Sequence, residues 1–522
     1  PDYTVNYYDV DNATVVATQT VEKDAAIANL NDGSNVTVAK GSKFRGWLLD
    51  PFKDEKAGAD YVVTDNPTSL YALVTDIEGD EANERHEYNF KNRYFYPEDH
   101  EALNLSGAKY YYNGNRHGYG MNGAGSFSVD VNGNATVIYE GCAYDNADSI
   151  VVSDSKGRVV ANIKKNSVDG TKTTFKYVGD ATTLTFSFDN TIYVHSLTVI
   201  NTGTGDIAKN AEGYYVATAG DANSVLSILD IIQANEDGNS RVKVFLPNGT
   251  YHFGRMTEKE FPVNNISIIG QSMDSTILVT APDKSVEGLG SADMFFNTKT
   301  GIYFQDLTLQ NALSYYNAGS AGRAAVIQDR GNRTIYKNVR MLSYQDTYYS
   351  QNSAMQSYFS GCDLHGTVDF LCGGGDVRFD STTISLEPRN KATGAGGRTI
   401  TAPTTTTRFG YVFDGCKVVD LATNGAGDWN YGRTWQNSPI CVWLNTTLDD
   451  VAAKTIVPLR WTQKGMNNRD PKVFGEYNTM DKTGKNITPE SNVITSYGGK
   501  FETILNADQA AVYAYDSMFT NW

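Results

Sequence analysis

The chain has 522 residues, of which 40% are hydrophobic, so it is long enough for about three domains and apolar enough for packed cores. Acidic residues outnumber basic residues 60 to 44, and the net charge of -16 excludes a generic nucleic-acid binder, which needs a basic surface. No apolar run reaches the roughly 20 residues of a membrane-spanning helix, so we expect a protein that does not span a membrane. No apolar leader follows Pro1, so we expect that any secretion signal has been removed or was never present.

Cysteine usage and composition narrow the class further. Five cysteines are few and include no CxxC pair, so neither a structural zinc site nor a disulfide scaffold is expected. With 48 glycines and 33 tyrosines, the composition is typical of a large β protein.

Residues 1–78 contain short strand patterns separated by turn signals. Residues 3–7 alternate apolar and polar side chains, and residues 14–18 form a β-branched run. The stretch 44–75 resembles the small β-grasp-like repeats of bacterial cell-wall and surface proteins, which implies a spacer or adhesion role. A charged linker, residues 76–87, is expected to follow.

Residues 88–202 continue with short strands and Asn/Gly turns, which predicts a β-sandwich. Tyrosines occupy positions 110–112 in this region. Aromatic rings of this kind bind sugars by stacking, so the sandwich is a candidate carbohydrate-binding module. Ordinary strand positions for these tyrosines are the favoured interpretation.

From residue 207 to 522 the pattern is that of a solenoid. Apolar residues at helical spacing predict a helix over 224–233, and a buried strand is predicted over 242–246. Short strands then recur, and their last apolar residues fall at positions 304, 336, 359, 379, 413 and 444. Intervals of 20 to 34 residues between these positions predict stacked coils with loop insertions. The segments are short and rich in β-branched residues, which favours a parallel β-helix over helical repeats.

In a β-helix, residues one coil apart stack at about 4.8 Å. Asp346 and Asp369 are 23 residues apart, which is one coil of the predicted repeat. Two carboxylates this close cannot both ionise at low cost, so one pKa rises while the other stays low. The pair can therefore supply a nucleophile and a proton donor, with Gln345 beside them.

Several motifs in this part resemble those of the pectin methylesterase family of carbohydrate esterases. The resemblance covers about residues 215–460 and includes the runs Gly322–Val326, Tyr344–Thr347, Gly366–Leu371 and Gly432–Trp435. It implies a right-handed parallel β-helix and hydrolysis of the methyl esters of polygalacturonate, without a metal or cofactor.

The resemblance also implies roles for individual residues. Asp369 is similar to the nucleophile, Asp346 to the acid and later the base, and Gln345 to an oxyanion donor. Arg433 is expected to pair with Asp369, because a guanidinium binds a carboxylate in bidentate fashion. The remaining expected substrate contacts are Trp435, Arg323, Phe370 and Thr347.

The sequence departs from the family pattern at two cleft positions. Arg323 stands where the family has a second glutamine, and Cys372 stands where an aromatic residue is usual. If Arg323 lies at the oxyanion position, its charge is expected to lower the pKa of Asp346 and hold this acid ionised. An acid-shifted optimum or a reduced kcat is the expected consequence.

Two other classes stay open at this point. A pectate or pectin lyase has the same fold but needs a calcium-binding acidic cluster and a base. A non-catalytic pectin-binding surface protein is compatible with the N-terminal modules. The esterase interpretation predicts methylated homogalacturonan as substrate, a monomer, and a secreted, periplasmic or cell-surface location in a bacterium.

Overall fold

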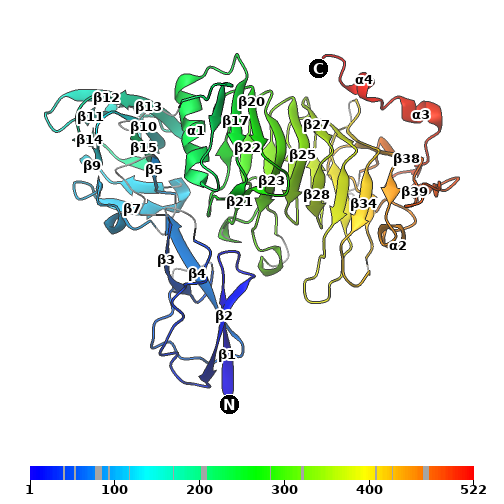
Figure 1. The fold of residues 1–522 in the computed structure, drawn as a ribbon, viewed down its shortest axis with the longest axis horizontal. Coiled ribbons are helices and arrows are strands. Elements are labelled where there is room, and N and C mark those ends of the chain that lie inside the picture. The colour runs from blue at the N-terminus through cyan, green and yellow to red at the C-terminus, as the bar shows by residue number, and fades with distance from the viewer. Residues whose placement is uncertain are drawn as a thin grey trace.

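The structure, a computed structural model, describes the chain except residues 39–41, 52–54, 77–84, 92–94, 117, 169, 202–207, 283, 319–321, 406–407, 426 and 463–468. Much of the predicted linker at 76–87 lies outside the described residues. A long β-helix carries two smaller β parts at its N-terminal end (Figure 1). Among the described helices, none has the length and apolar character needed to cross a membrane.

The N-terminal part is one mixed sheet. Its strand order is β2 (Val15–Glu22), β1 (Asp2–Tyr8), β4 (Thr68–Asp76) and β3 (Ser42–Leu48), and the central pair β1–β4 is parallel. One face of the sheet buries a small cluster around Trp47, whose ring meets Tyr7 edge-on at 4.7 Å. The resemblance of this part to β-grasp-like repeats stays a prediction.

The second part is a sandwich of two antiparallel sheets. The first contains β13 (Thr171–Tyr177), β10 (Ala135–Ala143), β15 (Ile192–Asn201), β8 (Gly118–Met121), β7 (Tyr110–Asn113) and β5 (Arg85–Asn89). The second contains β12 (Val159–Lys164), β11 (Ser149–Ser153), β14 (Thr182–Phe188), β9 (Gly125–Val131) and β6 (Leu103–Asn104). A shared core lies between them, where Phe127 stacks on Phe186 at 4.7 Å. Tyr110 and Tyr112 pack against Tyr119 and stay partly exposed.

The third part winds into a β-helix with three faces, and every strand pair within these faces is parallel. The first face contains β16 (Tyr214–Val216), β17 (Val242–Leu246), β20 (Ile266–Gly270), β23 (Tyr303–Asn311), β25 (Thr334–Leu342), β27 (Gln356–Ser360), β30 (Asp376–Asp380), β33 (Tyr411–Asp414), β36 (Ile440–Leu444) and β38 (Val473–Tyr477). The second contains β18 (Gly249–His252), β21 (Thr276–Thr280), β28 (Asp363–Gly366), β31 (Thr383–Leu386), β34 (Lys417–Asp420) and β37 (Thr447–Leu448). The third contains β19 (Lys259–Glu260), β22 (Phe295–Asn297), β24 (Ile327–Asp329), β26 (Tyr348–Ser350), β29 (Leu371–Gly373), β32 (Thr399–Pro403) and β35 (Asn430–Gly432).

Helix α1 (Ala222–Asn235) covers the N-terminal end of the β-helix, and its apolar side joins the core. The predicted helix at 224–233 lies inside it, and the predicted strand at 242–246 is β17. The prediction of an all-β fold with a right-handed parallel β-helix is confirmed.

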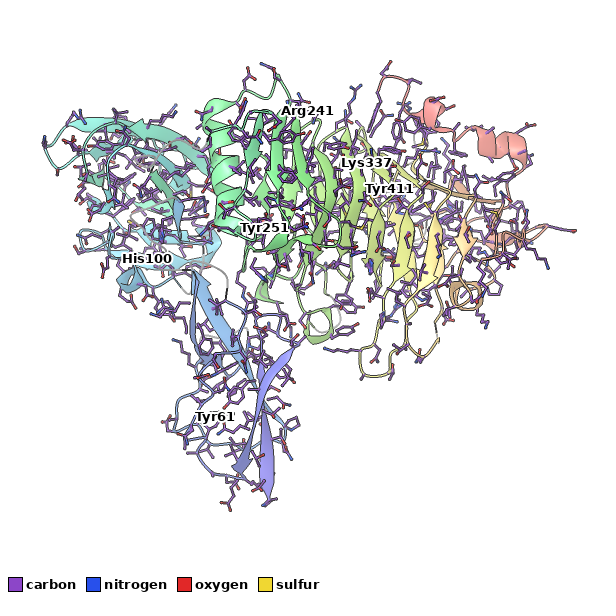
Figure 2. All side chains as sticks on the ribbon, in the orientation of Figure 1. Tyr61, His100, Arg241, Tyr251, Lys337 and Tyr411 are labelled. Atoms are coloured by element: carbon purple, nitrogen blue, oxygen red, sulfur yellow. The ribbon has the colours of Figure 1, made fainter. Side chains whose placement is uncertain are left out.

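Aromatic rings fill the interior along one register position. This row consists of Phe304, Tyr336, Phe359, Phe379, Phe413 and Trp443. Successive ring centroids are 3.8–5.4 Å apart, so each coil contributes one layer of the core. Tyr251 and Tyr411, labelled in Figure 2, are two further fully buried rings in the β-helix.

The sequence-based register is wrong by one residue in the last of these coils. The spacing makes Leu444 the counterpart of Phe413, but Trp443 pairs with Phe413 and Leu444 pairs with Asp414. Leu444 points outward into a second apolar cluster that the C-terminal segment covers. Because both faces of β36 are buried, apolar alternation does not distinguish inside from outside there.

Several contacts join the three parts. Arg85 of the sandwich donates from Nε to Asp230 of α1 at 2.6 Å, and both side chains are buried. Ile138 and Ile200 of the sandwich belong to the β-helix core cluster. Arg255 of the β-helix donates to the carbonyl of Val10 at 2.9 Å. The domain boundaries at 1–78, 88–202 and 207–522 stay a prediction.

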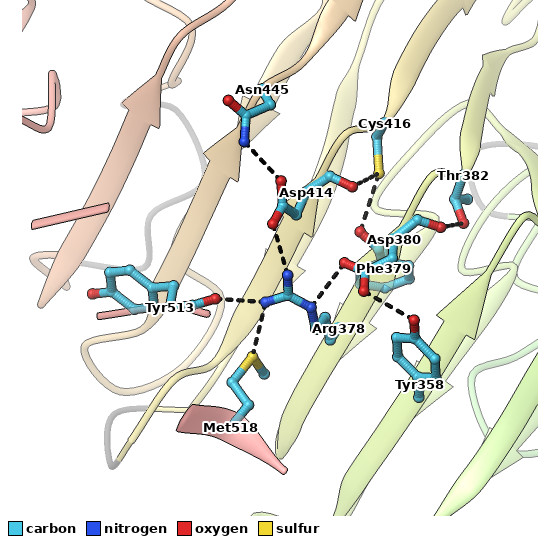
Figure 3. A network of polar contacts seen from close by, with 10 residues as sticks. All are labelled: Tyr358, Arg378, Phe379, Asp380, Thr382, Asp414, Cys416, Asn445, Tyr513 and Met518. Atoms are coloured by element: carbon cyan, nitrogen blue, oxygen red, sulfur yellow. Dashed lines mark hydrogen bonds and ion pairs between the residues drawn. The ribbon is translucent and has the colours of Figure 1, made fainter. Parts of the chain in front are cut away.

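The C-terminal helices α3 (Ala507–Ala511) and α4 (Tyr515–Met518) are tied to the β-helix by one buried arginine (Figure 3). Arg378 on β30 contacts Asp380 at 2.8 Å and Asp414 at 2.7 Å, and donates to the carbonyl of Tyr513. Its side chain is 3% exposed, so this one desolvated cation is shared by two carboxylates, which also accept from Tyr358 and Asn445.

We expect Arg378→Met to lower the free energy of unfolding by about 3–5 kcal/mol, because it leaves two carboxylates without their buried partner. Chemical denaturation measures this change. The matched control is Arg408→Met, because Arg408 is 56% exposed and lies 3.9 Å from Asp376. Because Arg408 is exposed and its contact with Asp376 is long, this pair is expected to contribute about 0–1 kcal/mol. Equal effects of the two substitutions would contradict the prediction.

Candidate active site

The two aspartates occupy equivalent positions in adjacent coils. Gln345 and Val368 form a parallel bridge, which places Asp346 beside Asp369, and the Asp346 N–H donates to the Val368 carbonyl at 3.2 Å. Each lies just before a strand of the third face, β26 or β29. The predicted one-coil spacing of the pair agrees with this register.

Both aspartates have a left-handed backbone conformation. Their φ values are 60° for Asp346 and 47° for Asp369. Residues with a side-chain carboxyl or amide tolerate this region better than other non-glycine residues. Two such positions in adjacent coils are typical of the strained backbone found at functional sites. The left-handed conformation at each aspartate interrupts the regular alternation of side chains along the strand.

A glycine makes room for the turn that carries Asp369. A Cβ atom on Gly366 would lie 2.2 Å from the Cβ of Phe370, which is closer than any real contact. Phe370 is fully buried in the core. The motif glycine therefore allows Phe370 to anchor the segment while Asp369 stays at the surface.

Arg433 binds Asp369 in bidentate fashion. Nε donates to Oδ1 at 3.0 Å and Nη2 donates to Oδ2 at 2.9 Å. Arg433 follows β35, two coils beyond Asp369, and its side chain reaches back past the small residue Ala402. This geometry fixes the orientation of the Asp369 carboxylate.

Asp346 is in a different environment. Its side chain is buried, and burial followed by the charge of Asp369 raises the pKa of Asp346 well above its usual range. Arg323 and Arg433 act in the opposite direction with less effect. The two carboxyl groups thus have different surroundings: Asp369 is bound by an arginine, whereas Asp346 is buried and has a raised pKa.

A small apolar cluster explains why Asp346 is desolvated. The cluster contains Ala325, Tyr349, Cys372 and Ala402, with Leu289 and Trp435 packed against it. The Cys372 sulfur lies 4.0 Å from Asp346 Oδ1. Trp435 packs on Tyr349 with ring centroids 5.9 Å apart and stays partly exposed. Cys372 is therefore part of the cover over the acid.

Gln345 is one coil from both Arg323 and Val368 and lies directly before Asp346. Its side chain is partly exposed, and no described residue forms a hydrogen bond with its amide group. An amide with this placement is available to donate to a ligand beside the paired aspartates.

Arg323 does not lie as predicted. Its Nε and Nη2 atoms donate to Glu287 Oε1 at 3.0 and 2.7 Å, so the guanidinium is already bound to a carboxylate. The pKa of Asp346 is raised, not lowered, because burial and Asp369 outweigh the charge of Arg323. A guanidinium bound to Glu287 does not meet the condition under which Arg323 would hold Asp346 ionised, and the role of Arg323 stays a prediction.

Two of the expected substrate contacts face the interior. Thr347 and Phe370 are both 0% exposed. The Thr347 hydroxyl donates to the carbonyl of His365 at 2.7 Å, within the wall of the coil. Neither side chain is accessible to a ligand, so the prediction that they contact substrate is wrong, and both residues have structural roles.

A third carboxyl group near the pair was missed. Phe295, Ile327 and Tyr348 are in register, so Asp293 stands two coils before Asp346 in the same row, with Ala325 between. Burial raises the pKa of Asp293 to about 7, and Asp293 acts electrostatically on Asp346. Asp293 precedes Asp346 by 53 residues, so the 23-residue spacing of the aspartate pair does not predict it.

The comparisons with known proteins concern this same part of the chain. The sequence model of the family described as Pectinesterase matches residues 214–518. Pectinesterase QRT1 of Arabidopsis thaliana is 29% identical over 271 residues, which are 50% of this chain and 66% of that protein. Putative pectinesterase 11 of the same plant is 25% identical over 260 residues, or 49% and 67% of the two chains. The alignments thus span about two thirds of the length of these relatives.

Among solved structures, the pectin methylesterase from carrot covers 56% of this chain and 88% of its own, with 20% identity and a TM-score of 0.46. The family match extends over more than half of the present sequence. The fold and the site place this protein among parallel β-helix proteins that carry two paired carboxyl groups on one face. This chain belongs to the pectinesterase family.

Proposed function

We propose that this protein hydrolyses galacturonate methyl esters in pectin to pectate and methanol through an aspartyl acyl-enzyme. The observation that carries the proposal is the pairing of an arginine-bound carboxylate, Asp369, with a buried carboxyl of raised pKa, Asp346, in adjacent coils. Membership in the pectinesterase family supports the same substrate class.

In the first half of the reaction, a carboxylate oxygen of Asp369 attacks the ester carbonyl carbon. The carbonyl oxygen gains negative charge in this step and accepts a hydrogen bond from the Gln345 amide. When the tetrahedral intermediate collapses, the bond from carbon to the methoxy oxygen breaks. The Asp346 proton goes to that oxygen, and methanol leaves.

In the second half, the ionised Asp346 takes a proton from a water molecule that attacks the acyl carbon. The second tetrahedral intermediate expels the Asp369 carboxylate, so the galacturonate carboxyl group is released and both aspartates return to their starting states. Arg433 keeps Asp369 oriented for attack and stabilises it as a leaving group. Trp435, which is partly exposed, packs against a sugar ring of the substrate.

The direct test is release of methanol from methylated pectin by the full chain. Two other outcomes separate the alternatives. An unsaturated uronate product without methanol would indicate a lyase. Binding of pectin without either product would indicate a non-catalytic surface protein.

We expect full activity after exhaustive treatment with a chelator, because carboxyl, amide and guanidinium groups of the chain fill every role in the proposed reaction. Among the described residues, no group of three or more His, Cys, Asp or Glu side chains is placed to hold a metal. The measurement is the methanol-release rate before and after chelation. Loss of activity that Ca²⁺ restores would count against the proposal.

The setting of the reaction is also a proposal. A polymeric pectin substrate outside the cell requires a secreted, periplasmic or cell-surface enzyme, and we propose that the chain acts there as a monomer on methylated homogalacturonan. The acidic net charge of -16 keeps the protein soluble but repels pectate, so product release is favoured at low ionic strength.

A further inference from the structure

An ion pair at the edge of the site has no part in the proposed reaction. Arg323 donates twice to one oxygen of Glu287, and the N–H of Gly288 donates to the Arg323 carbonyl at 3.2 Å. The two segments are therefore joined both through their side chains and through their backbones. Glu287 belongs to the loop between β21 and β22, far from Arg323 in sequence.

The arginine of this pair lies close to the acid. Arg323 forms a parallel bridge with Gln345, so it is one coil from the residue that precedes Asp346. Two carboxylates act on its guanidinium, Glu287 first and Asp346 second. An uncompensated cation within about 4–6 Å lowers the pKa of a carboxyl group by about 1–3 units. Without Glu287, Arg323 would therefore favour the ionised form of Asp346, which cannot protonate methanol.

We propose that Glu287 is a positioning residue that neutralises Arg323 and holds its guanidinium in an ion pair, so that Asp346 keeps the proton for the leaving methanol. This inference rests on the esterase function proposed above.

The burial of the pair explains why the contact is stable. The Glu287 side chain is 12% exposed, whereas that of Arg323 is 44% exposed. The second carboxylate oxygen of Glu287, Oε2, is buried and has no hydrogen-bond partner among the described residues. A desolvated carboxylate of this kind needs a nearby cation, so Glu287 retains Arg323 even though the arginine is open to solvent.

Other groups around Asp346 have fixed partners or no positive charge. The charged and titratable groups that face it are Asp369, Asp293, Arg323, Arg433, Cys372 and Tyr349. Arg433 is engaged by Asp369 through two hydrogen bonds. Arg323 is thus the cation whose effect on Asp346 depends on a residue outside the reaction, and that residue is Glu287.

The test is the pH profile of kcat/KM for methanol release by the wild type, Glu287→Gln, Arg323→Gln and the double variant. Loss of activity on the alkaline side reports ionisation of the acid, Asp346. Glu287→Gln keeps an oxygen that accepts from Arg323 but removes the compensating charge, so a lowered Asp346 pKa is expected. The alkaline limb should then move to lower pH by about 1 unit. In the double variant neither charge of the pair is present, so the limb should return towards the wild-type position.

Superimposable profiles for the wild type and Glu287→Gln would overturn the inference, and so would a shift that persists in the double variant. A merely structural role of Glu287 would lower activity at all pH values and leave the limb in place. Infrared difference spectroscopy of the Asp346 carboxyl, assigned with Asp346→Asn, follows the same ionisation without turnover. If the wild type releases no methanol, the function fails, but the infrared shift still decides the role of Glu287.

Discussion

Asp369→Asn should lower kcat for methanol release by at least about 10⁴-fold, because an amide cannot form the acyl-enzyme. The expected loss exceeds that of any other single substitution in the site. Asparagine is the appropriate replacement, since the φ of 47° at this position suits Asn and is unfavourable for Ala. An alanine variant would mix loss of the nucleophile with backbone strain.

The matched control for this experiment is Asp306→Asn. Asp306 also has a left-handed backbone, with φ 56°, and lies on β23 of the first face, away from the paired carboxyl groups. The same chemical change there should leave turnover unchanged. Steady-state rates for both variants, with circular dichroism to verify folding, provide the measurement. More than about a tenth of the wild-type activity in Asp369→Asn would refute its role as nucleophile.

Asp346→Asn should lower kcat by about 10²–10⁴-fold, the usual contribution of a positioned acid and base. The amide can neither protonate the departing methoxy oxygen nor accept a proton from water. With an activated ester, whose leaving group needs no proton, acylation should be less affected than deacylation. The acyl-enzyme is then expected to accumulate, and mass spectrometry detects it. A normal rate on pectin would contradict the assignment.

The same substitution should stabilise the fold at neutral pH. The pKa of Asp346 is raised by burial and by Asp369, so the folded state binds more protons than the unfolded state above the ordinary pKa of an aspartate. Stability from this group is therefore present at low pH and declines as pH rises towards the folded pKa. Each pKa unit of difference corresponds to about 1.4 kcal/mol.

Asp346→Asn removes this decline, because the amide does not ionise. The expected result is a higher Tm for the variant at neutral pH and a smaller difference at about pH 4, near the ordinary pKa of an aspartate. Thermal unfolding at the two pH values measures it. A lower Tm at neutral pH would show that the buried position needs the carboxyl group for structure.

The coil period was readable from the sequence because it arises from local chain geometry. Each strand pairs with the equivalent strand of the next coil, so the spacing of apolar residues along the chain indicates which residues stack. The 23-residue spacing of Asp346 and Asp369 therefore placed the pair correctly. Aromatic residues such as Phe359 and Phe379 likewise fell in register. Apolar spacing gave the wrong register at Leu444, because the C-terminal segment covers the outer face of this strand and makes it apolar as well.

The chemical properties of the individual residues depend on contacts that the coil repeat does not predict. Burial of Thr347 and Phe370 follows from the left-handed turns at the two aspartates, and alternation along a strand does not predict such turns. The raised pKa of Asp346 depends on what covers it, and the cover comes from several coils and from Trp435.

The repeat spacing was enough to predict the β-helix and the adjacency of Asp346 and Asp369, because strand stacking converts a spacing along the chain into a distance, and the motif resemblance pointed to an esterase. The tertiary structure alone decided that Arg323 binds Glu287 and that Asp293 is buried near the acid. Glu287 lies in a loop of irregular length, so no spacing rule connects it to Arg323. Charge compensation and desolvation are set by which side chains meet in space, and folding determines those contacts.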